Sequence, residues 1–297
     1  MTDSKLSIGG AVCFWRLAKS TNRGEVKAGL EGLGVGEYVP EPRSPLACLR
    51  AVLPEVYPAP KGCKHTVRPI KNGKTKGFAV VKEKPDDTHA GEAWGEVVAT
   101  AKIDEKENEL GLELDPWNHD NRYRVLEGME GAAGWLTNAS VGTALVNLVE
   151  KHCDGVALRP SGGVYWIRED RLDEWTRIAD VFESASAKGD SDGKEATPNA
   201  IYVLRVMADE QMVRAVGDAL TSEVSYEVAS IEADVAGGNL GGEACITRLR
   251  KTATLEAKVK RYERAFASPL TELQEAVRRA GVAVAQATLQ ASASAFA

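Results

Sequence analysis

The stretch that decides the fold is residues 208–236, which read ADEQMVRAVGDALTSEVSYEVASIEADVA. Apolar residues recur there in steps of three or four, which places them on one face of a helix. They are Val213, Val216, Leu220, Val224, Val228, Ile231 and Val235. After a glycine-rich turn at Gly237–Gly242, the same spacing returns from Ile246 to Phe266. Neither helix can bury such a face alone, so the two runs predict a helical hairpin.

A third helix is predicted after Ser268-Pro269, because proline fits the first turn of a helix but interrupts its middle. Its apolar face has no partner in a two-helix hairpin unless it folds back or meets another chain. Symmetric pairing is the commonest way to cover such a face, so we expect a homo-oligomer. The candidate oligomerisation residues are Leu220, Val259, Leu270, Leu273 and Val277.

Residues 184–200 separate this helical part from the rest of the chain. They contain no Leu, Ile, Val, Met or aromatic residue, so they predict a flexible linker that contributes nothing to a core. All six tryptophans precede the linker. We therefore expect an α+β core domain over residues 1–183, a linker over 184–200 and an all-α arm over 201–297.

The first 183 residues predict the α+β class, with an antiparallel β-meander and a helix-plus-hairpin unit. Ser44-Pro45 joins a helix cap to a first-turn proline, which predicts a helix to about Val56. Asn72-Gly73 is a strong hairpin signal, because both residues tolerate positive φ. The other predicted elements are strands at Ala11–Leu17, His65–Lys71, Lys76–Lys84, Ala93–Ile103 and Leu110–Leu114, helices from Ser20 or Thr21 to Leu33, at Asn121–Trp135 and at Ser140–His152, a hairpin of Val156–Arg159 with Val164–Ile167, and a helix at Asp170–Glu183.

The composition indicates a globular chain whose charges are segregated. Of its residues, 43% are hydrophobic and 27% are charged, with a net charge of −6. The sequence has no run of about 18 apolar residues and no signal-peptide core at its start, so we expect a cytoplasmic protein without a membrane partner. Residues 61–84 hold eight Lys or Arg and one acid, whereas residues 86–130 hold thirteen acids and four bases. Local patches therefore decide the partners.

The basic hairpin within residues 61–84 is the candidate nucleic-acid site. Its cations are Lys61, Lys64, Arg68, Lys71, Lys74 and Lys76. A twisted ribbon with this charge can follow a phosphate backbone, and its affinity would fall steeply with salt. Two alternatives stay open: the lysines protect an edge strand from aggregation, or the acidic segment that follows neutralises them within the chain.

A second hypothesis for DNA binding comes from the order of elements after Ser140. A helix there precedes a hairpin with Arg159 and Tyr165, which is the order of a recognition helix and its wing. The helix, however, has only Glu150 and Lys151 as charged residues. A helix that reads a groove presents several basic or amide side chains. We therefore favour a packing unit and keep Arg159 as a second candidate contact for nucleic acid.

The predicted helical hairpin has complementary charges. Residues 246–264 contain seven bases and two acids, whereas residues 201–242 contain two bases and seven acids. Opposite charges on neighbouring helices select the partner and its orientation. This pattern favours an antiparallel hairpin over nucleic-acid binding by the basic helix.

Signatures of catalysis and metal binding are weak in this sequence. Gly73-Lys74-Thr75 does not complete a phosphate loop, because Arg68 occupies the place of its first glycine. The five cysteines include no C-x-x-C pair, so they predict reduced thiols. Zinc could be bound only if distant residues met in space; they are Cys63, His65, His152 and Cys153. We predict no catalytic residue, no metal and no cofactor.

Three segments resemble a family of uncharacterised bacterial and phage proteins. They are residues 41–50 (EPRSPLACLR), the lysine-rich meander and residues 158–167 (LRPSGGVYWI). The resemblance implies no catalytic residues. Together these observations predict a non-enzymatic binding or scaffold protein, which oligomerises through its C-terminal helices and contacts nucleic acid through the basic hairpin. The alternative is an enzyme acting on nucleic acid, with a site assembled from residues distant in the sequence.

Overall fold

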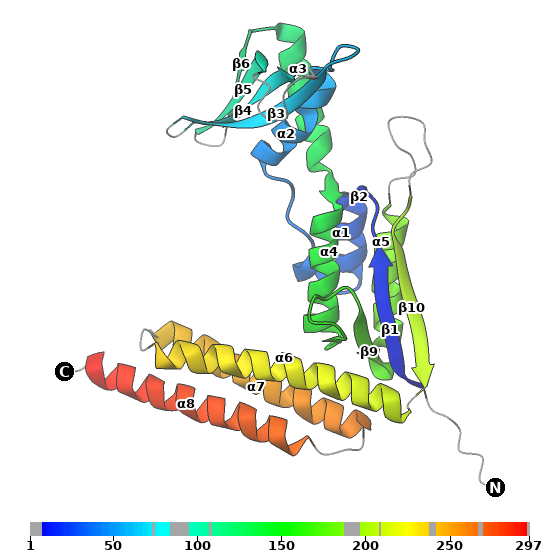
Figure 1. The fold of residues 1–297 in the computed structure, drawn as a ribbon, viewed down its shortest axis with the longest axis vertical. Coiled ribbons are helices and arrows are strands. Elements are labelled where there is room, and N and C mark those ends of the chain that lie inside the picture. Colours follow the sequence, from blue (N-terminus) through cyan, green and yellow to red (C-terminus); the bar gives the residue numbers. More distant parts are fainter. Residues whose placement is uncertain are drawn as a thin grey trace, which may run out of the picture. The chain divides into compact units, whose positions relative to one another are not determined.

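The computed structural model describes residues 8–72, 75–83, 95–106, 109–186, 197–207, 209–237, 242–266 and 270–295 (Figure 1). The chain forms two compact units. Unit 1 draws on Met1–Leu17, Gly142–Glu183 and Pro198–Ala297, and unit 2 draws on Ala18–Val141 and Ser184–Thr197. Helices and antiparallel sheets occur in both units, which confirms the α+β class.

Unit 2 is built on the predicted meander. Its strands are β3 (Lys64–Asn72), β4 (Thr75–Glu83), β5 (Glu96–Lys106) and β6 (Glu109–Asp115), which pair antiparallel in that order. The helices α2 (Pro45–Val56) and α3 (His119–Ala133) pack against one face of this sheet in a common apolar core. The Ser44 hydroxyl accepts a hydrogen bond from the Ala47 amide, so α2 begins at the predicted cap.

The remainder of unit 2 corrects one predicted cap. Helix α1 (Arg23–Gly32) begins after Asn22, whose side chain accepts a hydrogen bond from the Glu25 amide. Ser20 and Thr21, the predicted caps, instead belong to β2 (Ser20–Asn22), which pairs with β7 (Trp135–Thr137). A short helix, η1 (Gly36–Tyr38), follows α1.

Unit 1 contains a second antiparallel sheet, in the order β10-β1-β9-β8. Its strands are β1 (Ile8–Arg16), β8 (Val156–Ala157), β9 (Tyr165–Arg168) and β10 (Ala200–Met207). Helix α4 (Asn138–Asn147) continues into η2 (Leu148–His152) before β8, and η3 (Glu169–Arg171) leads into α5 (Leu172–Ser184) after β9. Trp15 of β1 lies against Trp175 of α5, with ring centres 6.3 Å apart.

Three long helices complete unit 1: α6 (Glu210–Ala236), α7 (Gly242–Phe266) and α8 (Thr271–Ala295). They share an apolar core that also includes Val156 of β8 and Trp166 of β9. Ion pairs between α6 and α7 run antiparallel along the helices, Asp234 with Arg248, Glu227 with Lys251 and Glu223 with Lys258. The predicted charge-matched hairpin and third helix are confirmed.

The compact units differ from the predicted division. Residues 201–207, assigned from sequence to the helical arm, form most of β10 and pair with β1 near the start of the chain. Because the helices share their core with β8 and β9, they belong to the same unit as that sheet. The described residues of the predicted linker contradict the expectation that it contributes nothing to a core: Ala185 is fully buried, Ser186 bridges to Thr21, and Ala200 begins β10. Its residues 187–196, like Gly73, residues 238–241 and Ser268-Pro269, lie outside the described residues.

Candidate functional site

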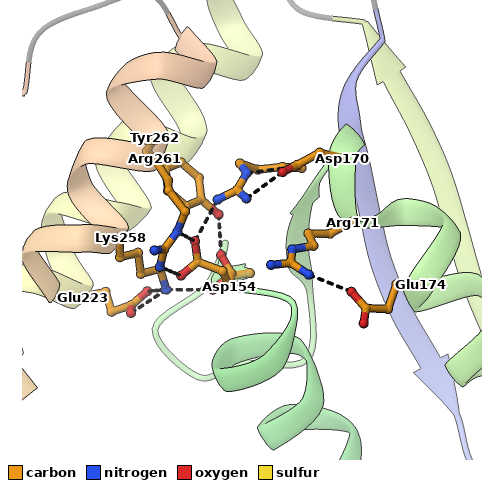
Figure 2. Close-up of polar contacts among 10 residues, drawn as sticks. Asp154, Asp170, Arg171, Glu174, Glu223, Lys258, Arg261 and Tyr262 are labelled. Atoms are coloured by element: carbon orange, nitrogen blue, oxygen red, sulfur yellow. Dashed lines mark hydrogen bonds and ion pairs between the residues drawn. The ribbon is translucent and has the colours of Figure 1, made fainter. Parts of the chain in front are cut away.

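A connected polar group of unit 1 is centred on Asp154, between η2 and β8 (Figure 2). Asp154 has a φ of 58°, a left-handed conformation that aspartate tolerates better than most residues. Its carboxylate accepts hydrogen bonds from Arg168 Nη1 at 2.7 Å and from Arg261 Nε and Nη2 at 2.7 and 2.9 Å. The Tyr262 hydroxyl donates to the Asp154 carbonyl at 2.8 Å. The group therefore joins β9 and α7 to the turn before β8.

Arg168 is the buried cation of this group, with a side chain 7% exposed. It also donates to both carboxylate oxygens of Asp170 at 2.9 Å, and this pairing lowers the pKa of Asp170. Its guanidinium carbon lies 5.5 Å from the centre of the Tyr262 ring. Burial lowers the pKa of Arg168, but its bonds to Asp170 and the charge of Asp154 outweigh that effect and the net shift is upward.

Lys258 of α7 extends the same group toward α6. Its side chain is 6% exposed, and Nζ donates to the Gly155 carbonyl at 2.8 Å and to the Glu223 carboxylate at 2.7 and 2.9 Å. Each charge in this group faces an opposite charge within it. We interpret this group as the anchor that fixes α7 to the sheet. Removing one partner of a buried ion pair leaves an unpaired buried charge, and this costs far more free energy than the intact pair contributes.

A groove of about 770 Å³ lies beside this anchor, between α6 and the turn that joins β8 to β9. Its charged lining residues are Glu150, Arg159, Asp218, Glu223 and Glu227. Burial raises the pKa of Glu150, and the neighbouring charge of Glu223 adds to this, while Lys258 opposes it. Glu223 and Glu227 pair with lysines of α7, and Asp218 pairs with Arg214 of α6, so most of the acidic charge that lines the groove is balanced.

The predicted nucleic-acid residues lie in two different units. In unit 2, Lys61, Lys64, Arg68 and Lys76 are all exposed. The side chain of Lys71 and all of Lys74 lie outside the described residues. Arg159 is exposed in unit 1, where it donates to the Ser161 hydroxyl at 2.8 Å. The structure therefore does not bring Arg159 and the hairpin together within one unit.

Strand register defines a second face of the unit 2 sheet, opposite the face that packs on α2 and α3. We call it the open face because its edge strands carry exposed side chains, although Ala79 and Val81 at its centre are buried. Across one row of this face stand Arg68, Ala79, Thr100 and Asp115, and the next row includes Lys102 and Glu113. The full open face comprises Lys64, Thr66, Arg68 and Ile70 of β3, Gly77, Ala79, Val81 and Glu83 of β4, Val97, Thr100 and Lys102 of β5, and Glu113 and Asp115 of β6.

The open face is basic along β3 and acidic along β6. Two of its cations are paired within the chain, Arg68 with Glu83 at 2.8 Å and Lys102 with Glu113 at 3.6 Å. Hydrogen bonds from Thr66 and Arg68 lower the pKa of Glu83. The first pair lies within the basic hairpin and the second lies within the acidic segment that follows, so these two pairs do not show the predicted neutralisation of one segment by the other. Lys64 remains exposed at the sheet edge.

The candidate oligomerisation residues lie inside unit 1. Leu220, Val259, Leu273 and Val277 are buried in the core of the three helices, and Leu270 packs against that core. The third helix therefore folds back onto the hairpin, which covers the apolar face from which an oligomer was expected.

The four candidate zinc ligands are divided between the two units. Cys63 and His65 belong to unit 2, where His65 Nδ1 lies 2.8 Å from the Tyr57 carbonyl oxygen. His152 and Cys153 belong to unit 1, where His152 Nε2 lies 2.7 Å from a Glu174 oxygen. In the described part of the chain, no group of three or more His, Cys, Asp or Glu side chains could hold a metal ion.

Two features were missed from the sequence. The Asp154 anchor combines residues far apart in the chain, so no local pattern marks it. The exposed aromatic residues Trp117 and Tyr123, each 63% exposed, lie in unit 2 within the segment DPWNHDNRYR. That segment is polar and has no apolar periodicity. This pattern could have indicated from the sequence that its aromatic rings are not core residues.

Comparison with known proteins identifies one family. The profile of a family described as "Family of unknown function (DUF6744)" matches residues 8–294. No curated protein and no solved structure matches the chain. Among the described residues, no helix is both long and apolar enough to cross a membrane.

Proposed function

We propose that this chain, which belongs to the DUF6744 family of unknown function, is a binding protein that contacts nucleic acid through the open face of unit 2. The observation that carries the proposal is that Lys64, Thr66 and Arg68 share one face of the edge strand β3, where Lys64 and Arg68 are exposed. Alternate residues of a strand are about 6.6 Å apart. The three polar side chains therefore form a line along which a phosphate backbone can run.

The pairing of Arg68 with Glu83 has a consequence for affinity. A phosphate that binds Arg68 must displace or repel the Glu83 carboxylate, because both are anions that use the same guanidinium. An exposed ion pair is weak, so phosphate can compete for the Arg68 guanidinium. We therefore expect Glu83→Gln to bind nucleic acid more tightly than the wild type.

The test is fluorescence anisotropy of a labelled oligonucleotide at several salt concentrations. The variant K64E/R68E removes two proposed phosphate contacts, so the slope of log affinity against log salt should fall by about 1.4–1.8. The control is R250E/R264E, which changes two exposed arginines of α7 in unit 1 and alters the net charge equally. Equal losses in both double variants, or no binding by the wild type, would contradict the proposal.

A further inference from the structure

The corner between β6 and α3 in unit 2 carries exposed aromatic rings. The Asn118 side chain caps α3 by accepting a hydrogen bond from the Asn121 amide at 2.9 Å. Trp117 precedes this cap, and the Arg122 guanidinium lies 5.8 Å from the centre of its ring. This is the position of a hydrophobic staple, here made by a cation over an indole. The contact holds the indole in place while 63% of Trp117 stays exposed.

The corner lies at the edge of the sheet opposite β3. Asp115, two residues before Trp117, stands in the same row of the open face as Arg68. Four strands span three spacings of about 4.8 Å, so β3 and β6 are about 14 Å apart. Tyr123 is as exposed as Trp117 but lies on α3, which packs on the other face of the sheet, so it does not share the open face with Arg68. One edge of the sheet thus offers cations, and the other offers the indole of Trp117.

We propose that unit 2 binds single-stranded nucleic acid, with its phosphates along β3 and a base stacked on Trp117. This inference rests on the proposed function and names its substrate class. Bases in a duplex already stack on one another, so exposed aromatic rings can stack only on unpaired bases. Each base stacked in this way contributes about 1–3 kcal/mol to binding.

The charge on the open face also favours a single strand. Glu113 and Asp115 make the β6 edge acidic, and the Glu113 side chain is 69% exposed. A single strand has one phosphate backbone, which can follow β3 while its bases extend toward β6. A duplex has a second backbone, and that backbone would face the carboxylates of the β6 edge.

The experiment compares a labelled oligothymidine with a duplex of the same length, by anisotropy at equal salt. Wild-type protein should bind the single strand more tightly than the duplex. The variant W117A should lose about 5- to 140-fold in affinity for the single strand, which corresponds to one stacked base. Its salt slope should not change, because stacking releases no counterions. W117F should recover part of the affinity, because it restores a ring for stacking.

The matched control is Y226A, which removes an aromatic residue 75% exposed on α6 in unit 1 and should leave affinity unchanged. Near-UV circular dichroism of each variant checks that the fold is retained. Equal affinity of the wild type for both nucleic acids, or unchanged binding by W117A, would overturn the single-strand inference while leaving the proposed function intact. Failure of the wild type to bind either nucleic acid would overturn both.

Discussion

Replacing Asp154 with asparagine tests the anchor of unit 1. Asparagine keeps the left-handed backbone conformation and the carbonyl that receives the Tyr262 hydroxyl, so the change removes mainly the negative charge. Arg168 and Arg261 then share a neutral amide in place of a carboxylate. The variant isolates the electrostatic contribution of one side chain that is 12% exposed.

The expected cost follows from the burial of the two arginines. Breaking a buried ion pair by removing one partner costs about 3–5 kcal/mol. Arg168 retains Asp170, and Arg261 is 38% exposed and can be solvated, so the lower end of this range applies. We predict that Asp154→Asn lowers the free energy of unfolding by about 3 kcal/mol. Asp154→Ala should cost about 1 kcal/mol more, because alanine is strained at positive φ.

The assay is urea denaturation followed by tryptophan fluorescence, since Trp166 and Trp175 are buried in unit 1. The control is Asp170→Asn, which removes the other carboxylate bound to Arg168. Because the Asp170 side chain is 64% exposed, this control should cost no more than about 1 kcal/mol. If Asp154→Asn is no more destabilising than Asp170→Asn, the group around Asp154 does not anchor α7.

Three other predictions follow from particular contacts. Leu220→Ala should lower the free energy of unfolding by about 2–5 kcal/mol and alter near-UV circular dichroism, because the fully buried Leu220 shares its core with Trp166; an unchanged tryptophan signal would show that the helices are independent. Gly77→Ala should destabilise unit 2 by about 1–3 kcal/mol in urea denaturation, because its Cβ would lie 2.2 Å from the Ala101 carbonyl oxygen; unchanged stability would refute this clash. Glu150→Gln should raise the unfolding midpoint at pH 7 but not near pH 4. Because the pKa of Glu150 is raised in the folded state, the wild type loses stability as pH rises through the interval between the unfolded and folded pKa values of this residue. A larger increase in the unfolding midpoint at pH 4 than at pH 7 would contradict the raised pKa of Glu150.

Local patterns in the sequence predicted most elements of the fold. The apolar period and the opposite charges of α6 and α7 predicted their antiparallel packing, and Ser44-Pro45 predicted the start of α2. These predictions succeed because the decisive interactions join residues within one element or in neighbouring elements. The meander between β3 and β6 is predictable for the same reason, since each strand pairs with the next.

Contacts between distant segments could not be predicted. The segment IYVLRVM at residues 201–207 is rich in β-branched residues, yet its partner β1 lies near the opposite end of the chain. The charge pattern matched Lys258 to α6, but Arg261 on the same helix bonds to Asp154. The oligomer was expected because the third helix was treated as unpaired, and its return onto α6 and α7 depends on the tertiary fold. In the candidate nucleic-acid site, sequence marked the cations of β3 but not Trp117 at the other edge.

The most direct test of the central claim is photo-cross-linking of the full chain to a single-stranded oligonucleotide that carries 5-iododeoxyuridine. Mass spectrometry of the cross-linked peptides then locates the bound strand without any substitution. We predict cross-links in the peptide that contains Trp117, and their loss at high salt. Cross-links confined to peptides of α6, α7 and α8 would contradict binding by the open face of unit 2.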